Sequence, residues 1–187
     1  MNPIEQLIAG FQDLVAQVPA LLQPLILMAA GAVPFIEGEG AAIIGLVGGL
    51  NPVVAGLAAA AGNFLCVVLV ALLTSRARTA VTSRQRVGVP AGPSDEAPEH
   101  TESVGAAPSK PASKGRQRFN RWLVRFGVPG ASILGPLAIP TQFTTAALVA
   151  AGTPRGWVLL WQAVAIVIWT TVATVSALIA LQVVSLI

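Results

Sequence analysis

The segment VPFIEGEGAAIIG, Val33–Gly45, places two carboxylates, Glu37 and Glu39, within a long apolar region. They are the only Asp, Glu, Lys, Arg or His residues between Leu14 and Ser75. An ionised carboxylate is costly in apolar surroundings unless it is paired or hydrogen-bonded. The segment therefore predicts either a functional site inside a membrane or a solvated loop at the level of the lipid headgroups.

The composition of the 187-residue chain is that of an integral membrane protein. Hydrophobic residues make up 55% of it and charged residues 10%, and the mean hydropathy is +0.76, whereas soluble domains carry about 25% charged residues. Ten of the eleven Lys and Arg residues lie between Arg76 and Arg125. This distribution predicts a multi-pass protein of the plasma membrane with residues 76–125 in the cytoplasm. It indicates membrane lipids as partners, and not nucleic acid.

The order of apolar and polar segments divides the chain into a first membrane half, 1–75, a disordered cytoplasmic linker, 76–115, and a second membrane half, 116–187. The linker is rich in Ser, Pro, Gly and Arg, and it is too polar to bury a core. The first half is predicted to contain an amphipathic helix over 3–18, two short apolar arms over 20–33 and 41–50, and a full span over 53–75. The arm 20–33 is short for a straight span, so the sequence leaves open whether it spans the membrane or forms half of a hairpin.

The second half repeats this order of elements. It begins with a basic amphipathic stretch over 116–126, continues with two apolar arms around a break at 136–145, and ends with a long apolar helix over 157–187. Because the loop between the halves is predicted to be cytoplasmic, the two halves would insert in opposite directions. The predicted fold class is therefore an all-α integral membrane protein, an inverted repeat of two re-entrant helical hairpins and two full transmembrane helices with amphipathic interfacial helices.

The stretch PFIEGEG and the second proline-led break resemble the motifs of the small multidrug export protein family, which belongs with the DedA (VTT-domain) membrane proteins. Glu37 and Gly40 match the first motif, whereas Glu39 stands where the family has arginine. The residues that correspond to the second motif, which lacks the family's glycines here, are Pro136, Pro140, Thr141 and Thr144. The resemblance covers roughly 20–75 and 127–180. It implies a transporter whose re-entrant hairpins face each other across the bilayer.

The candidate substrate- or proton-binding residues lie at the two breaks and in the adjoining helices: Glu37, Glu39, Asn63, Pro140, Thr141, Gln142, Thr144 and Arg155. Two neighbouring buried carboxylates favour protonation of at least one of them, which suits the exchange of a proton for a cation. Glu37 is predicted to face the protein interior, opposite residues 140–144, and Glu39 to lie nearer the outer surface. Asn63 is predicted to hydrogen-bond a neighbouring helix, with a substrate contact as the alternative. Thr141 and Gln142 suit either substrate binding or packing of a broken helix tip.

The sequence contains no Ser/His pair, metal-ligand cluster, phosphate-binding loop or Gly-rich nucleotide motif. We therefore expect no enzymatic activity, no bound metal and no cofactor. One predicted function is the proton-coupled export of a small molecule or the translocation of a lipid carrier. The alternative is a non-transporting membrane protein with a role in assembly or maintenance of the cell envelope. The identity of a substrate and the formation of a homo-oligomer stay open.

Overall fold

The computed structural model describes residues 3–87 and 127–186, and all regular secondary structure within these ranges is helical. This confirms the all-α class for the described part of the chain. The basic stretch 116–126 and residues 88–115 of the predicted linker lie outside it. In chain order the elements are α1 (Pro3–Gln17), α2 (Gln23–Gly31), α3 (Glu37–Val47), α4 (Pro52–Val87), a helical segment over 127–134, the 3-10 turn η1 (Gly135–Leu137), α6 (Thr141–Ala150) and α7 (Arg155–Ser185).

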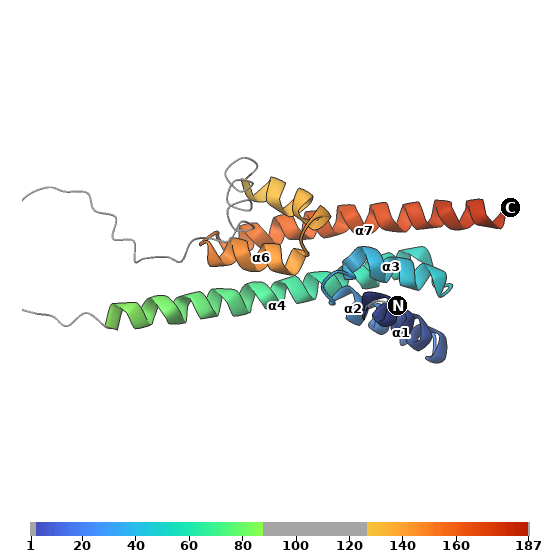
Figure 1. Cartoon of the computed structure of the whole chain (residues 1–187), viewed down its shortest axis with the longest axis horizontal. Coiled ribbons are helices and arrows are strands. Elements are labelled where there is room, and N and C mark those ends of the chain that lie inside the picture. Colours follow the sequence, from blue (N-terminus) through green and yellow to red (C-terminus); the bar gives the residue numbers. More distant parts are fainter. Residues whose placement is uncertain (1–2, 88–126, 187) are drawn as a thin grey trace, which may run out of the picture.

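Two long helices, α4 and α7, run antiparallel along the molecule and lie side by side at its middle (Figure 1). The segments Pro52–Val81 and Arg155–Ser185 are long enough to cross a membrane, and their most apolar 18-residue stretches have mean hydropathies of 2.4 and 2.3. Both expose large apolar side chains to the surroundings, such as Leu57 in α4 and Ile179 in α7. Such exposure is unfavourable in water and suits contact with lipid.

Helix α4 continues beyond the predicted boundary at Ser75 and ends at Val87. The first part of the predicted linker, 76–87, is therefore helical. The physical reason is local, because this stretch contains neither glycine nor proline until Gly88, and its Arg, Ala and Gln residues are compatible with a helix. The change from apolar to polar residues after Ser75 marks the end of the apolar span, but the helix itself continues.

The same kind of turn precedes each long helix. Gly49 (φ 79°) and Gly152 (φ 101°) adopt the left-handed conformation that ends many helices. In both turns a backbone N–H reaches five residues back to a carbonyl: Leu50 N to Gly45 O at 3.0 Å, and Thr153 N to Leu148 O at 3.2 Å. A proline then starts or precedes the next helix, where it has no intrahelical N–H bond to lose.

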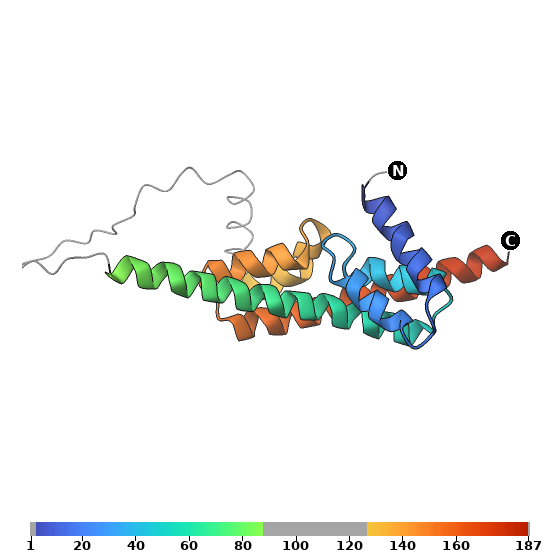
Figure 2. The ribbon, with the colours of Figure 1, turned by 90° about the horizontal axis from the view of Figure 1, so that it is seen from below.

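Each long helix is preceded by a pair of short helices around an irregular break. Helices α2 and α3 form the first hairpin, which packs on the first part of α4. The segment 127–134 and α6 form the second hairpin, which lies further along α4 toward Val87 and beside the start of α7 (Figures 1 and 2). The two breaks, over 32–36 and 135–140, face each other near the middle. The inverted-repeat relation and the re-entrant insertion of these hairpins stay predictions.

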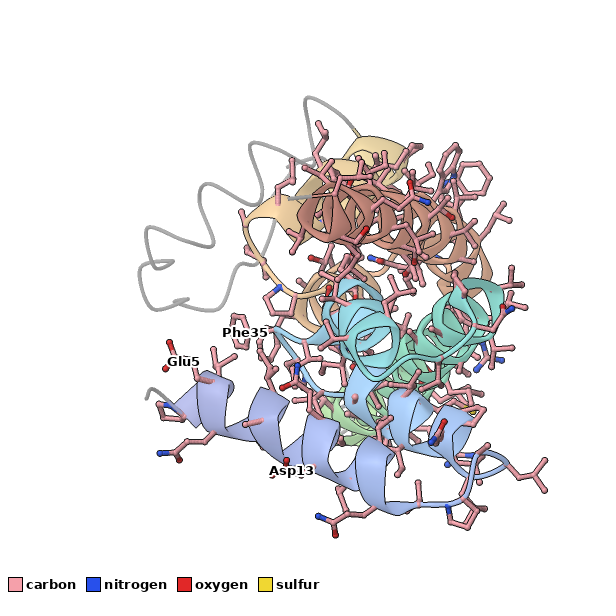
Figure 3. All side chains as sticks on the ribbon, turned by 90° about the vertical axis from the view of Figure 1, so that its right-hand side faces the viewer. Glu5, Asp13 and Phe35 are labelled. Carbon is pink, nitrogen blue, oxygen red and sulfur yellow. The ribbon has the colours of Figure 1, made fainter. Side chains whose placement is uncertain are left out.

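Helix α1 is inclined to the long axis and covers the first hairpin (Figure 2). Its Ile8, Phe11 and Val15 pack against the core of α2, α3 and α4. Figure 3 shows Glu5 and Asp13 on this helix, at the periphery of the bundle. Helix α1 is thus amphipathic, as its sequence predicts, and stays away from the meeting point of the two breaks.

Candidate functional site at the meeting point of the two hairpins

Glu37 is the residue that joins the two hairpins. The residue is 5% exposed, and its Oε1 accepts hydrogen bonds from Thr141 N at 2.6 Å and from Thr141 Oγ1 at 2.8 Å. Thr141 is the first residue of α6 and has no intrahelical partner for its N–H. Glu37 therefore caps a helix from the other half of the chain, and the positive end of that helix favours the ionised carboxylate. This contact confirms that Glu37 lies inside the protein opposite the second break.

The Thr141 hydroxyl also connects Glu37 to α4. Thr141 Oγ1 lies 3.0 Å from Asn63 Oδ1, and Gln142 Nε2 donates to the same oxygen at 3.3 Å. All four side chains are buried. A hydroxyl has only one proton, so Thr141 can donate to Glu37 or to Asn63 but not to both at once. These four residues, Glu37, Asn63, Thr141 and Gln142, form what we call the central network. The predicted bond from Asn63 to a neighbouring helix is confirmed.

The first break holds strained backbone beside the carboxylate. Phe35 (φ 73°) and Glu37 (φ 51°) both have positive φ although neither is glycine. Such conformations cost about 1–3 kcal/mol each and are frequent at functional sites. The Phe35 ring also packs edge-on against Phe143 of α6, with ring centroids 6.3 Å apart. Figure 3 shows Phe35 on the loop, near the segment of the second break. The two breaks are therefore held together by a polar and an aromatic contact.

A cleft of about 390 Å³ opens beside Glu37 between the two breaks. Its carboxylates are Glu37 and the less buried Glu39, and its aromatic lining residues are Phe35 and Trp169. The Trp169 N–H donates to Ile133 O at 2.7 Å, which attaches α7 to the second hairpin. The other lining residues are Ile36, Gly40, Pro136, Leu137, Ala138, Ile139 and Pro140. Carboxylates and aromatic faces in one cleft suit a cationic guest.

The remaining predicted residues divide between this site and a distant one. Pro140 is the N-cap residue of α6, and Thr144 Oγ1 bonds back to Pro140 O at 3.4 Å, so both shape the tip of α6. Arg155 belongs to neither the cleft nor the central network. It lies at the start of α7 and lines a separate, open pocket with Ser75, Arg76, Thr79 and Ala80. Arg155 is among the candidate binding residues predicted above, but the length of α6 separates it from Glu37.

Sequence reasoning missed several buried polar residues that point between the helices: Ser132, Thr145, Gln162, Thr170 and Thr174. Thr170 lies against Gly38, at the start of α3, where there is no room for a Cβ. The signal that could have found Gln162 is its isolation, since it is the only amide in the apolar run from Trp157 to Trp169. Polar residues inside a membrane helix usually face the protein interior.

No protein family, no curated protein and no solved structure matches this chain. The resemblance to the small multidrug export proteins therefore stays an interpretation of the two motifs. The function of the site has to follow from its own geometry and chemistry.

Proposed function

We propose that this chain is a small proton-coupled transporter of the plasma membrane. In this proposal Glu37 binds and releases the proton whose movement drives the export of a small molecule or the translocation of a lipid carrier. The observation that carries the proposal is the placement of Glu37, a buried carboxyl group held at the meeting point of two broken helical segments and lining a cleft. Burial disfavours its ionised form, whereas the two Thr141 donors and the N-terminus of α6 favour it. Opposing effects of this kind suit a group that must both bind and release a proton.

The central network offers a way to couple that proton to the rest of the site. An ionised carboxylate is a stronger acceptor than an amide oxygen, so it holds the Thr141 hydroxyl. When Glu37 is neutral, Asn63 Oδ1 competes for the same hydroxyl proton. Protonation of Glu37 would therefore loosen the contact between the first break and α6. A looser contact between the hairpins is the local change that an opening of the cleft requires.

The arrangement of elements supports transport by the two halves moving against each other. Each half has a broken hairpin, a glycine turn and a long apolar helix. In inverted-repeat transporters, broken segments in matching positions form the binding site. With residues 76–125 in the cytoplasm, the cleft between the breaks would lie within the bilayer. The relation to the small multidrug export and DedA proteins is part of this proposal.

The decisive experiment measures substrate-dependent proton flux in proteoliposomes that contain the full chain. Candidate substrates are lipophilic cations and a polyprenyl phosphate carrier. We expect Glu37→Gln to abolish proton-driven flux while the protein still folds, because the amide mimics the neutral acid and cannot release a proton. Glu39→Gln is the matched control, since it makes the same chemical change two residues away on the rim of the cleft, and it should retain most activity.

Equal flux in the wild type and Glu37→Gln would remove Glu37 from the mechanism. Absence of flux with every substrate tested, in protein shown to be folded, would favour the non-transporting envelope role instead.

The orientation is tested separately with a cysteine placed at Ser94 in a Cys66→Ala background. We expect a membrane-impermeant thiol reagent to label it in inverted vesicles and not in intact cells, because residues 76–125 carry most of the basic residues. Labelling from outside intact cells would reverse the proposed topology.

A further inference from the structure

Three polar side chains near the Glu37 site are fully buried without hydrogen-bond partners. Ser132, Thr145 and Gln162 are each 0% exposed. Within residues 3–87 and 127–186, no partner is found for Ser132 Oγ, Thr145 Oγ1 or either amide atom of Gln162. Buried polar atoms are nearly always hydrogen-bonded, and an unpaired amide is especially unfavourable in apolar surroundings. A further polar group is therefore needed to supply hydrogen-bond partners for these three side chains.

The packing of α6 on α7 brings Thr145 and Gln162 to the same level. The two helices are joined by a short turn and run antiparallel, and next to that turn Leu148 and Val149 pack with Val158. Thr145 lies one helical turn further from the connection on α6, and Gln162 lies one turn further on α7. Residues three or four apart share a helix face. Thr145 and Gln162 therefore both lie one helical turn beyond this apolar contact, on the facing sides of α6 and α7.

The segment 127–134 adds Ser132 to the same layer. Val128 packs against the same apolar cluster, and at the other end of the segment a Cβ on Gly135 would lie 3.3 Å from Thr144 Oγ1. Ser132 lies between these two contacts and one turn after Val128, on the same face. We call Ser132, Thr145 and Gln162 the inner polar layer.

The inner polar layer lies between the central network and the end of the molecule that carries Arg155. Gln142 of the network precedes Thr145 by one turn of α6. On the other side, an apolar cluster of Ala71, Leu148, Val149 and Val158 separates the layer from the turn before Arg155. The order along the helices is thus the Glu37 network, the inner polar layer and an apolar barrier.

We infer that the inner polar layer binds water and is the aqueous connection between Glu37 and the Arg155 side of the membrane. Water both donates and accepts hydrogen bonds, so it can satisfy the hydrogen-bonding groups of two hydroxyls and an amide together. A single ion cannot do this. The apolar cluster closes the connection, and movement of the second hairpin opens it. The role in proton movement rests on the proposed function, whereas the presence of water does not.

Water access is tested by the labelling rate of Thr145→Cys in the full chain with Cys66→Ala. The probe is a small charged methanethiosulfonate, added separately to each side of oriented vesicles. The control is Leu27→Cys, which is equally buried, at 0% exposed, in the apolar core of the first half. From the Arg155 side, we expect Thr145→Cys to react at least about ten times faster than the control, because the reaction needs a thiolate, which apolar burial suppresses.

A second variant tests the layer as a unit. Adding Gln162→Leu to Thr145→Cys should lower its labelling rate to that of the control, since an apolar side chain of similar size displaces the water. If Thr145→Cys does not fold, Ser132→Cys takes its place with the same expectation. Labelling no faster than the Leu27→Cys control, or labelling only from the opposite side, would overturn the inference. Labelling needs no transport, so fast labelling without proton-driven flux would contradict the proposed function alone.

Discussion

The two helical hairpins have the same order of elements but differ in what they bury. The first, α2 and α3, packs on α4 through an apolar core with backbones in close contact, and its only buried ionisable side chain is Glu37. The second, the segment 127–134 and α6, buries hydroxyl and amide groups, and the hydroxyls of Ser132 and Thr145 lack partners among the described residues. The acid thus comes from the tightly packed hairpin and its donors come from the polar one. A tight hairpin fixes the carboxyl group, while a polar hairpin can rearrange around it.

The largest effect is expected where the first hairpin is tightest. Gly62 of α4 lies against the backbone of Met28 in α2, and Gly31 of α2 lies against that of Ala59 in α4, with no room for a Cβ in either place. Gly62→Ala should therefore destabilise the protein by roughly 3 kcal/mol or more, because a helix backbone has to move. The measurement is thermal unfolding in detergent.

Gly10→Ala is the control for that change, since nothing lies within 4 Å of a Cβ at Gly10 in α1. It should be neutral or slightly stabilising because alanine favours helix. Similar unfolding temperatures for both variants would mean that the first hairpin is no more tightly packed than α1.

An intermediate effect is expected at the link between the hairpins. Thr141→Val removes the hydroxyl that donates a hydrogen bond to Glu37 but keeps the backbone N–H that donates the other one. Losing a hydrogen bond to a charged group should cost roughly 2 kcal/mol. Thermal unfolding measures this cost, and flux should fall as well. Thr171→Val on the exposed face of α7 makes the same chemical change and should have little effect. Equal effects of the two variants would show that the Glu37 contact contributes nothing to stability.

The smallest effect is expected where α7 holds the second hairpin. Trp169→Phe keeps a ring in the cleft but removes the N–H that bonds Ile133 O. A single neutral hydrogen bond contributes about 1 kcal/mol, so the unfolding temperature should fall slightly. Trp157→Phe, at a position 47% exposed, is the control and should change less. A larger loss at Trp157 would place the main support of the second hairpin elsewhere.

Several features could be predicted from the sequence because their causes are local. Proline and glycine positions gave the breaks and turns, since proline cannot continue a helix and glycine tolerates positive φ. The isolation of Glu37 and Glu39 in an apolar region marked the candidate site. The end of α4 was missed, because a change from apolar to polar residues ends a span but does not end a helix. The long apolar stretches gave the two helices that could span a membrane.

The tertiary structure alone decided which residues meet. Glu37 and Thr141 are 104 residues apart, and their contact depends on how closely the first hairpin approaches α4 and how α6 lies on α7. Spacing along the chain carries no information about that approach. For the same reason the sequence grouped Arg155 with the site, although a full helix separates them. It also overlooked Gln162, which is fully buried only because other helices pack against α7. Local chemistry determined the elements and the acid, and long-range packing determined its partners.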